Sequence, residues 1–267
     1  MLKGGAPANK RLGQHFLHDP TVIGRILDAL DPRPGEHIVE IGPGRGALTA
    51  GLAASGARLT VIELDRHLAA ELAGHPELAG TDVRQLDALK VDYAALADDG
   101  LIRIVGNLPY NISSPLLFRF LESAPHIRDL TLMLQREVVE RMAANPGTRT
   151  YGRLTVMLAA RCRVEKLFAV GAGAFNPPPK VESAVVRLVP HAEPPFDPGD
   201  WTVFANLVRA GFGARRKTLR NALRALAEAA TIEAAGLDPG ARPDTLAPAD
   251  YARLSSHLHD EHSHPSD

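Results

Sequence analysis

The sequence predicts an α/β protein in which a mostly parallel sheet is followed by a small all-helical C-terminal domain. Strand-like and helix-like segments alternate through the first two-thirds of the chain, and this alternation is typical of βαβ units with parallel strands. Beyond residue 190, a proline-rich stretch is followed by helical patterns only. We therefore expect an N-terminal arm at 1–18, a sheet domain at 19–190, a helical domain at 191–255 and a flexible tail at 256–267.

Local patterns predict the elements one by one. Asp19 followed by Pro20 marks the start of a helix, because aspartate caps a helix and proline fits its first position. Short apolar runs predict strands at 37–41, 59–62, 83–86, 101–105 and 130–134. Apolar residues at helical spacing predict helices at 20–30, 47–54, 66–72, 114–121, 201–210, 217–229 and after Pro248.

Composition excludes several classes of protein. The 267 residues are 45% hydrophobic and 23% charged, as in an ordinary globular protein. The single cysteine excludes a disulfide framework and a cysteine-rich zinc site, and we expect no metal. No apolar stretch reaches the roughly 18 residues of a membrane span, and the basic N-terminus lacks the apolar segment of a secretory signal. We therefore expect a cytoplasmic protein without a membrane partner.

The charges are nearly balanced in number but unevenly distributed. Thirty lysines and arginines against 31 aspartates and glutamates give a net charge of −1. Residues 60–100 nevertheless hold nine acids and three bases, whereas residues 203–224 hold six bases and no acid. Such a basic segment fits either a solvated helix face or a nucleic-acid-binding face that the total charge conceals.

A glycine-rich turn follows the first expected strand, with the sequence Glu40-Ile41-Gly42-Pro43-Gly44-Arg45-Gly46-Ala47. Glycines there let the backbone turn tightly and approach a ligand closely. Glu63 ends the next strand, 21 residues after Gly42, where a carboxylate can accept hydrogen bonds from both hydroxyls of a ribose. These two features fit NAD and S-adenosylmethionine equally well.

Two further strand ends favour S-adenosylmethionine. Asp87 follows the third expected strand, where an acid can hold the exocyclic amine of an adenine ring. Asn107 opens the tetrad Asn107-Leu108-Pro109-Tyr110 after the fourth strand, and a hydride-transfer enzyme has no obvious use for this tetrad. Because ligands of parallel sheets bind beyond the carboxyl ends of the strands, we expect all of these residues to line one crevice.

The tetrad suits methylation of an exocyclic amino group, whose lone pair is delocalised into the adenine ring. The side-chain oxygen of Asn107 and the carbonyl of Leu108 can accept hydrogen bonds from the two N–H groups of that amine. These hydrogen bonds aim the lone pair of the nitrogen. Pro109 fixes the backbone, and Tyr110 offers a ring on which the base can stack. We expect most of the acceleration to come from in-line positioning, which can supply roughly 7–11 kcal/mol.

The order and spacing of these motifs resemble those of the bacterial small-subunit ribosomal RNA adenine N6-dimethyltransferases, the KsgA/RsmA family. Matching segments lie at 13–17, 40–44, 61–65, 106–113, 134–138, 151–154, 175–183 and 215–221. The resemblance implies a Rossmann-like S-adenosylmethionine-dependent methyltransferase sheet and N6-dimethylation of two adjacent adenosines near the 3′ end of 16S rRNA. Other classes stay open: a large-subunit rRNA adenine methyltransferase, a mainly non-catalytic ribosome-assembly factor, and an NAD-linked oxidoreductase.

The resemblance also assigns roles to individual residues. It implies catalytic roles for Asn107, Leu108, Pro109 and Tyr110. It implies contacts to S-adenosylmethionine from His15, Leu17, Gly42, Gly44, Glu63, Asp87 and Asn107. His15 stands where the family commonly has asparagine, and a histidine there can contact the carboxylate of the cofactor in a pH-dependent way.

The expected partners are small-subunit rRNA and the immature small ribosomal subunit, bound by a monomer. A base inside a helix cannot reach the methyl donor, so a loop or an extruded adenine is the expected target. The resemblance implies that Phe175 lies across the target pocket from Tyr110 and clamps the flipped base. The full set of expected RNA-binding residues, most of them phosphate-gripping cations, is Phe175, Lys180, Arg209, Arg215, Arg216, Lys217 and Arg220.

Overall fold

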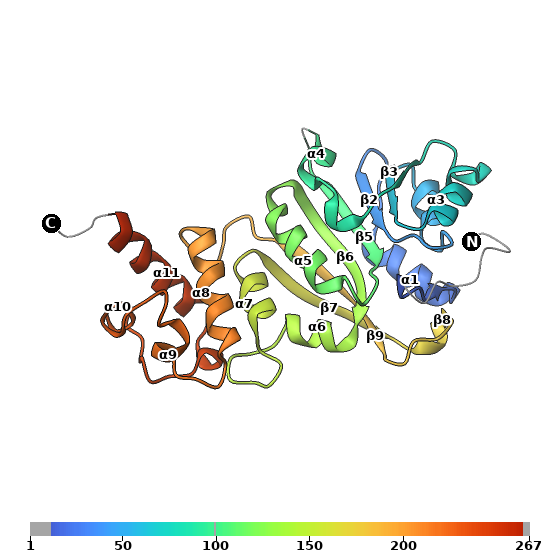
Figure 1. Ribbon diagram of the computed structural model, residues 1–267. Helices are drawn as coiled ribbons and strands as arrows, with labels where there is room; N and C mark the ends of the chain where they lie inside the picture. The colour runs from blue at the N-terminus through green and yellow to red at the C-terminus, as the bar shows by residue number, and fades with distance from the viewer. Residues whose placement is uncertain (1–11, 99, 264–267) are drawn as a thin grey trace. The chain divides into compact units, whose positions relative to one another are not determined.

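The computed structural model describes residues 12–98 and 100–263, with only the backbone described at 260–263. Residues 1–11 of the expected arm and 264–267 of the expected tail lie outside the described residues. The chain divides into two compact units, which are coloured along the sequence in Figure 1. One unit comprises residues up to 139 together with 164–190, and the other comprises 140–163 and the residues from 191 onward.

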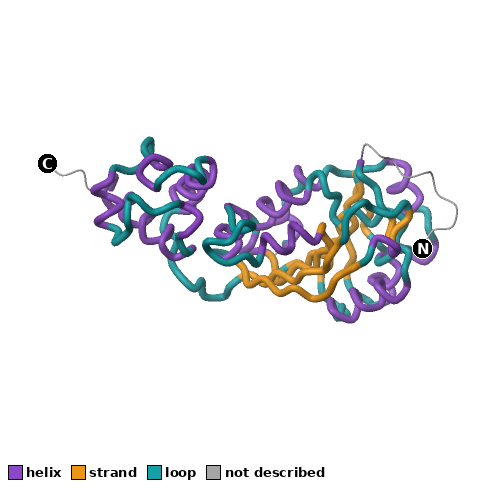
Figure 2. The backbone as a smooth tube through the Cα atoms, turned by 90° about the horizontal axis from the view of Figure 1, so that it is seen from below, coloured by secondary structure: helices purple, strands orange, loops and turns teal. Residues whose placement is uncertain are grey.

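The first unit is built on a seven-stranded sheet, which confirms the α/β class. Its strands are β2 (His37–Ile41), β3 (Arg58–Glu63), β4 (Asp82–Gln85), β5 (Ile102–Asn107), β6 (Ile127–Gln135), β7 (Cys162–Val170) and β9 (Ser183–Pro190). They lie in the order β4-β3-β2-β5-β6-β9-β7, and the first five are parallel, whereas β9 runs antiparallel to β6. Figure 2 shows these strands, in orange, gathered in one layer. The parallel register brings the carboxyl ends of β2, β3 and β5 to one edge.

Helices and a short strand pair complete this unit. The helices are α1 (Pro20–Leu30), α2 (Thr49–Ala54), α3 (Arg66–Ala73), α4 (Tyr93–Ala97), α5 (Ser113–Glu122) and the first residues of α6 (Arg136–Met142). Asp19 caps α1 as expected, accepting from the backbone N–H groups of Thr21 and Val22. A separate antiparallel pair joins β1 (Phe16–Leu17) to β8 (Phe175–Asn176). This pair ties the N-terminal arm to a segment that lies about 160 residues further along the sequence.

The second unit is helical. Its helices are α7 (Arg153–Ala159), α8 (Trp201–Gly213), α9 (Leu219–Leu223), α10 (Ala229–Ala234) and α11 (Pro248–Ser263). The sequence-based division leaves residues 140–163 with the sheet domain, but their side chains pack with this unit. The hydroxyl of buried Tyr151 donates to the carbonyl of Leu246 at 2.7 Å, and Arg215 donates to the carbonyl of Arg149. No helix in the described ranges is long and apolar enough to span a membrane.

Several elements differ from the sequence-based expectation. Strand β7 was not predicted, because its first half carries Arg163, Glu165 and Lys166 and only its two end residues are fully buried, although it ends in an apolar run at 167–170. Of the helix expected at 217–229 only α9 is present, and α10 begins at the last expected residue, Ala229. The expected tail is helical up to Ser263. Strand β9 was also not predicted, although it carries the apolar run Ala184-Val185-Val186.

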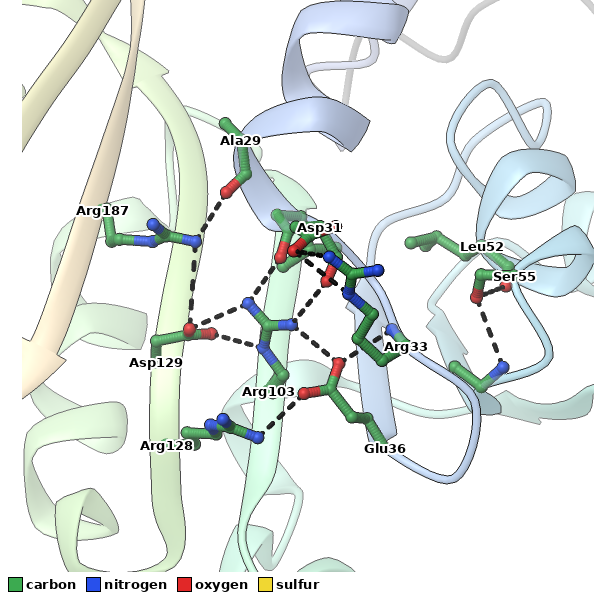
Figure 3. Close-up of polar contacts among 12 residues, drawn as sticks. Ala29, Asp31, Arg33, Glu36, Leu52, Ser55, Arg103, Arg128, Asp129 and Arg187 are labelled. Atoms are coloured by element: carbon green, nitrogen blue, oxygen red, sulfur yellow. Dashed lines mark hydrogen bonds and ion pairs between the residues drawn. The ribbon is translucent and has the colours of Figure 1, made fainter.

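A buried ionic cluster joins β5 and β6 near their amino ends, at the end of the sheet opposite the carboxyl edge (Figure 3). Arg103, which is 5% exposed on β5, forms a two-pronged ion pair with Asp129 on β6 at 2.9 and 3.0 Å. The same guanidinium bonds Glu36 at 2.8 Å and donates to the carbonyls of Leu30 and Asp31 at the end of α1. All five contacts are therefore lost together when the guanidinium is removed.

Replacing Arg103 with methionine is expected to lower the free energy of unfolding by about 3–5 kcal/mol, because two carboxylates lose their buried counter-charge. The exposed pair between Arg33 and Asp31 supplies the control, since both side chains are more than half exposed. Arg33→Met should cost less than about 1 kcal/mol. Chemical denaturation of both variants measures the difference. Equal losses in the free energy of unfolding would show that the buried cluster contributes no more to stability than the exposed pair does.

Candidate active site

One cavity lies at the carboxyl edge of the parallel strands in the first unit. Its walls come from the arm that carries β1, the glycine turn after β2, and the segments that follow β3, β4 and β5. Ten residues predicted from sequence line it together: His15, Leu17, Gly42, Gly44, Glu63, Asp87, Asn107, Leu108, Pro109 and Tyr110. The strands thus gather side chains that are scattered over almost 100 residues of sequence.

The glycine turn is shaped by positions that only glycine adopts without strain. Gly42, Gly44 and Gly46 have φ values of +64°, +56° and +73°. A Cβ atom on Gly44 would lie 2.9 Å from the ring of Phe16, so the arm also packs too closely for a side chain. The turn therefore presents bare backbone to the cavity, as a close-lying ligand requires.

Glu63 ends β3 with its carboxylate held by backbone donors. Oε2 accepts from the N–H of Gly44 at 3.2 Å, and Oε1 accepts from the N–H of Asp65 at 2.9 Å. Burial raises the pKa of Glu63 above the usual carboxyl value, and these two backbone hydrogen bonds oppose the rise. Each oxygen keeps a second lone pair, so the carboxylate can still accept hydrogen bonds from a ligand.

Glu40 is a cavity residue that the site prediction misses. It is 2% exposed at the end of β2, and its Oε2 atom has no hydrogen-bond partner in the described part of the chain. Burial raises its pKa to about 8, and the nearby charge of Glu63 adds to the rise. The signal was available, because Glu40 is the only acid of its strand and directly precedes the glycine turn. A cationic ligand group in the cavity would favour the ionised form.

The region beyond β3 and β4 combines an acid with two exposed apolar side chains. Asp87 accepts from the N–H of Leu89 at 3.0 Å and lines the cavity. Leu64 and Leu86 also line it and are 48% and 46% exposed, so two apolar side chains are open to a ligand in this part of the wall. Two apolar side chains near one carboxylate suit a flat heteroaromatic ring that carries an amino group.

The tetrad that begins at the last residue of β5 is oriented by two hydrogen bonds at its first two residues. The Asn107 Nδ2 atom donates to the backbone carbonyl of His15 at 3.1 Å. Because that carbonyl can only accept, the amide nitrogen must face it, and Oδ1 is left for the cavity. The N–H of Leu108 donates to the carbonyl of Met133 at 3.1 Å, which fixes the following backbone.

Tyr110 is held at its hydroxyl and at its ring. The hydroxyl hydrogen-bonds the Oγ atom of buried Ser183 at 2.7 Å, and burial raises the pKa of Tyr110. The imidazole of His15 stacks against the ring, with centroids 5.8 Å apart and planes at 27°. The sequence gives little warning of Ser183, since a serine at a strand start is common. The hydroxyl contact and the ring contact therefore both hold the tyrosine ring in place.

The expected RNA-binding residues do not form one set. Phe175 is 2% exposed and packs in the hydrophobic core with Leu17, so its ring does not line the cavity opposite Tyr110. The pairing of β1 with β8 explains this position, because it places Phe175 directly across from Leu17. The expected adenine clamp is therefore not formed in this structure.

The basic residues also differ from one another. The guanidinium of Arg215 donates hydrogen bonds within the second unit, to Asp244 at 2.9 Å and to the carbonyls of Arg149 and Thr148 at 2.8 Å. Arg209 donates to Asn206 at 2.9 Å on the surface of α8. The remaining expected cations are exposed, Lys180 in the first unit and Arg216, Lys217 and Arg220 in the second. Three exposed cations of the second unit thus lie within five residues of sequence, Arg216, Lys217 and Arg220.

Comparisons with known proteins agree with this geometry. The family described as ribosomal RNA adenine dimethylase matches residues 5–260. The ribosomal RNA small subunit methyltransferase A of Xanthomonas campestris pv. campestris is 56% identical over 252 residues, covering 94% of this chain and 96% of that protein. The protein of the same name from Pseudomonas aeruginosa is 54% identical over 253 residues, covering 94% of each chain.

Solved structures place the fold in the same group. A dimethyladenosine transferase from Plasmodium falciparum superposes with a TM-score of 0.79 at 26% identity, covering 93% of this chain and 98% of that one. The 23S rRNA methyltransferase ErmE superposes with a TM-score of 0.66 at 30% identity, covering 91% and 99%. Both similarities extend over more than nine-tenths of the chain.

Proposed function

This chain belongs to the ribosomal RNA adenine dimethylase family, and from that membership and its cavity we infer that it is an S-adenosylmethionine-dependent rRNA adenine N6-dimethyltransferase. Its substrate is the 16S rRNA of the small subunit, and its products are two adjacent dimethyladenosines near the 3′ end. The names of the relatives that are more than half identical favour the small-subunit rRNA over the large-subunit alternative. An NAD-linked oxidoreductase is kept only as the alternative that the test below decides.

The observation that carries this proposal is the orientation of Asn107. Its amide nitrogen is taken by the His15 carbonyl, so its oxygen is the atom that can meet a ligand in the cavity. A cavity made only for a nucleotide cofactor gains nothing from a fixed amide oxygen beside a tyrosine ring. An amino group on a stacked base needs both.

The residues that surround the cavity fit S-adenosylmethionine part by part. We assign the ribose hydroxyls to Glu63, the adenine amine to Asp87 and the faces of the adenine ring to Leu64 and Leu86. The unpartnered oxygen of Glu40 suits the positively charged end of the cofactor. Glycines 42 and 44 let the backbone approach it, and Leu17 with the main chain of His15 closes the wall on the arm side. The bound cofactor supplies an electrophilic methyl group on a sulfonium.

The chain's own contribution to the reaction is to aim the acceptor nitrogen. Asn107 Oδ1 and the Leu108 carbonyl accept hydrogen bonds from the two N–H groups of the exocyclic amine. These hydrogen bonds encourage the nitrogen to pyramidalise. Tyr110 stacks on the base, a contact worth about 1–3 kcal/mol. Bound S-adenosylmethionine would supply the methyl group to the aimed nitrogen, which would give up one proton to water. A second round with fresh cofactor completes the dimethylated product.

We propose that the true substrate is an immature small subunit, met in the cytoplasm by a monomer. The exposed cations of the second unit, Arg216, Lys217 and Arg220, would contact phosphates without reading sequence. Lys180 would do the same from the first unit. Arg215 has a different role, because it braces the second unit from within.

The direct test incubates the protein with labelled S-adenosylmethionine and small subunits that lack the modification. We expect label in dimethyladenosine of 16S rRNA, and we expect large subunits in a parallel reaction to stay unlabelled. No transfer to competent small subunits would refute the proposal. Tight binding of NADH without binding of S-adenosylmethionine would revive the oxidoreductase alternative.

A further inference from the structure

The arm that lines the cavity is tied by backbone pairing to the segment around β8. Strands β1 and β8 pair over only two residues, Phe16 with Asn176 and Leu17 with Phe175. One more bond, from the N–H of His18 to the carbonyl of Ala174 at 2.9 Å, extends the ladder. So short a pair leaves the exposed residues after Asn176 to be held by other contacts.

His15 supplies such a contact at the far end of the ladder. Its Nδ1 atom lies 2.8 Å from the carbonyl oxygen of Pro177, directly after β8. Because a carbonyl can only accept, Nδ1 must carry the proton and donate it. That nitrogen is therefore engaged by the loop and is not available to the carboxylate of a cofactor.

The same imidazole also supports the tetrad. It stacks on Tyr110, whose hydroxyl is anchored on Ser183 at 2.7 Å. The main chain of His15 meanwhile accepts the amide of Asn107. One residue thus contacts the loop after β8, the stacking ring and the proposed catalytic amide.

We propose that the side chain of His15 is a positioning residue for the acceptor adenine, and this rests on the proposed function. Its bond to Pro177 holds the imidazole in place, and the imidazole in turn supports the Tyr110 ring on which the base is proposed to stack, while binding of S-adenosylmethionine relies on other residues. This assignment replaces the sequence-based expectation that the imidazole contacts the cofactor carboxylate. The effect of substitution should therefore fall on the RNA substrate and on turnover, and not on affinity for S-adenosylmethionine.

Three variants separate the two contacts that the imidazole makes. His15→Asn keeps a donor, because the asparagine Nδ2 atom occupies the place of the histidine Nδ1 atom, but it removes the ring. His15→Phe keeps a ring against Tyr110 and removes the N–H group that donates to the Pro177 carbonyl. His15→Ala removes both. His18→Asn is the matched control, since His18 lies on the same arm with an exposed side chain.

The measurements are the Kd of S-adenosylmethionine by calorimetry without RNA, and kcat and KM for unmodified small subunits. We expect His15→Ala to lower kcat/KM for the subunits about tenfold, as the loss of one hydrogen bond and one ring contact allows. His15→Phe should lose about fivefold, and His15→Asn should recover to within about threefold of wild type. All variants should bind S-adenosylmethionine within about twofold of wild type.

Two results would overturn the inference while the wild-type enzyme methylates its substrate normally. One is a rise in the Kd of S-adenosylmethionine that matches the fall in kcat/KM, which would make the imidazole a donor-binding group. The other is wild-type kinetics in His15→Ala. If the wild-type protein itself fails to methylate small subunits, the proposed function fails instead.

Discussion

Asn107→Ala is expected to lower kcat for rRNA methylation by a factor of at least about 100 while leaving binding to the small subunit intact. Removing a preorganised hydrogen-bonding group from an active site costs about 10²–10³ in rate in other enzymes. The alanine loses both the acceptor for the adenine N–H and the bond to the His15 carbonyl, so the lone pair is no longer aimed. Single-turnover methylation with saturating S-adenosylmethionine measures the rate directly.

Two companion measurements make this result specific. Thermal unfolding of Asn107→Ala should match wild type closely, because the side chain is only partly buried. Filter binding to unmodified subunits should likewise be unchanged, since the phosphate contacts are made elsewhere. If Asn107→Ala keeps full activity, the assignment of the tetrad is wrong.

Glu63→Gln is expected to weaken S-adenosylmethionine binding by about 100-fold. The carboxylate already accepts N–H bonds from Gly44 and Asp65, so a glutamine must turn its own NH₂ group toward one of these donors. It also has one acceptor fewer for the ribose hydroxyls, and each hydrogen bond to a charged group contributes about 1.5–3 kcal/mol. Calorimetry with S-adenosylmethionine alone measures the Kd without RNA.

The same residue predicts a pH dependence of cofactor affinity. Burial places the pKa of Glu63 above the usual carboxyl value, and only the ionised form can accept from both hydroxyls. Affinity should therefore be full above this raised pKa and fall as the pH drops through it. Glu71→Gln, an exposed change of the same charge on α3, should leave both the Kd and its pH dependence unaltered. A flat profile in wild type would exclude Glu63 as the ribose ligand.

The sequence predicts the donor side of this site well because local rules govern it. A glycine turn after a strand and single polar residues at strand ends follow from the geometry of one βαβ unit after another. Parallel register then brings Gly42, Glu63 and Asn107 to one cavity without further information. A separate role for Glu40 was not predicted, because the residue lies within the segment that was assigned to the glycine turn.

The acceptor side was harder to predict because long-range pairing determines it. Nothing near Phe175 in sequence reveals that it faces Leu17 in the core, since the β1–β8 pair is two residues long. The partners of His15 and Tyr110, Pro177 and Ser183, likewise lie more than 70 residues away from them. The acceptors of Arg215 likewise lie far from it in sequence, because the carbonyls of Thr148 and Arg149 belong to a distant loop of the second unit. Charge alone does not separate a phosphate-binding arginine from a bracing one.

The central claim is that this protein dimethylates two adjacent adenosines of 16S rRNA, and mass spectrometry of that rRNA tests it most directly. The rRNA is compared between cells that carry the gene, cells that lack it, and deleted cells that express either wild type or Asn107→Ala. We predict that both dimethyladenosines disappear on deletion, return with wild type and stay absent with Asn107→Ala. Dimethyladenosines at undiminished levels in the deleted cells would contradict the account.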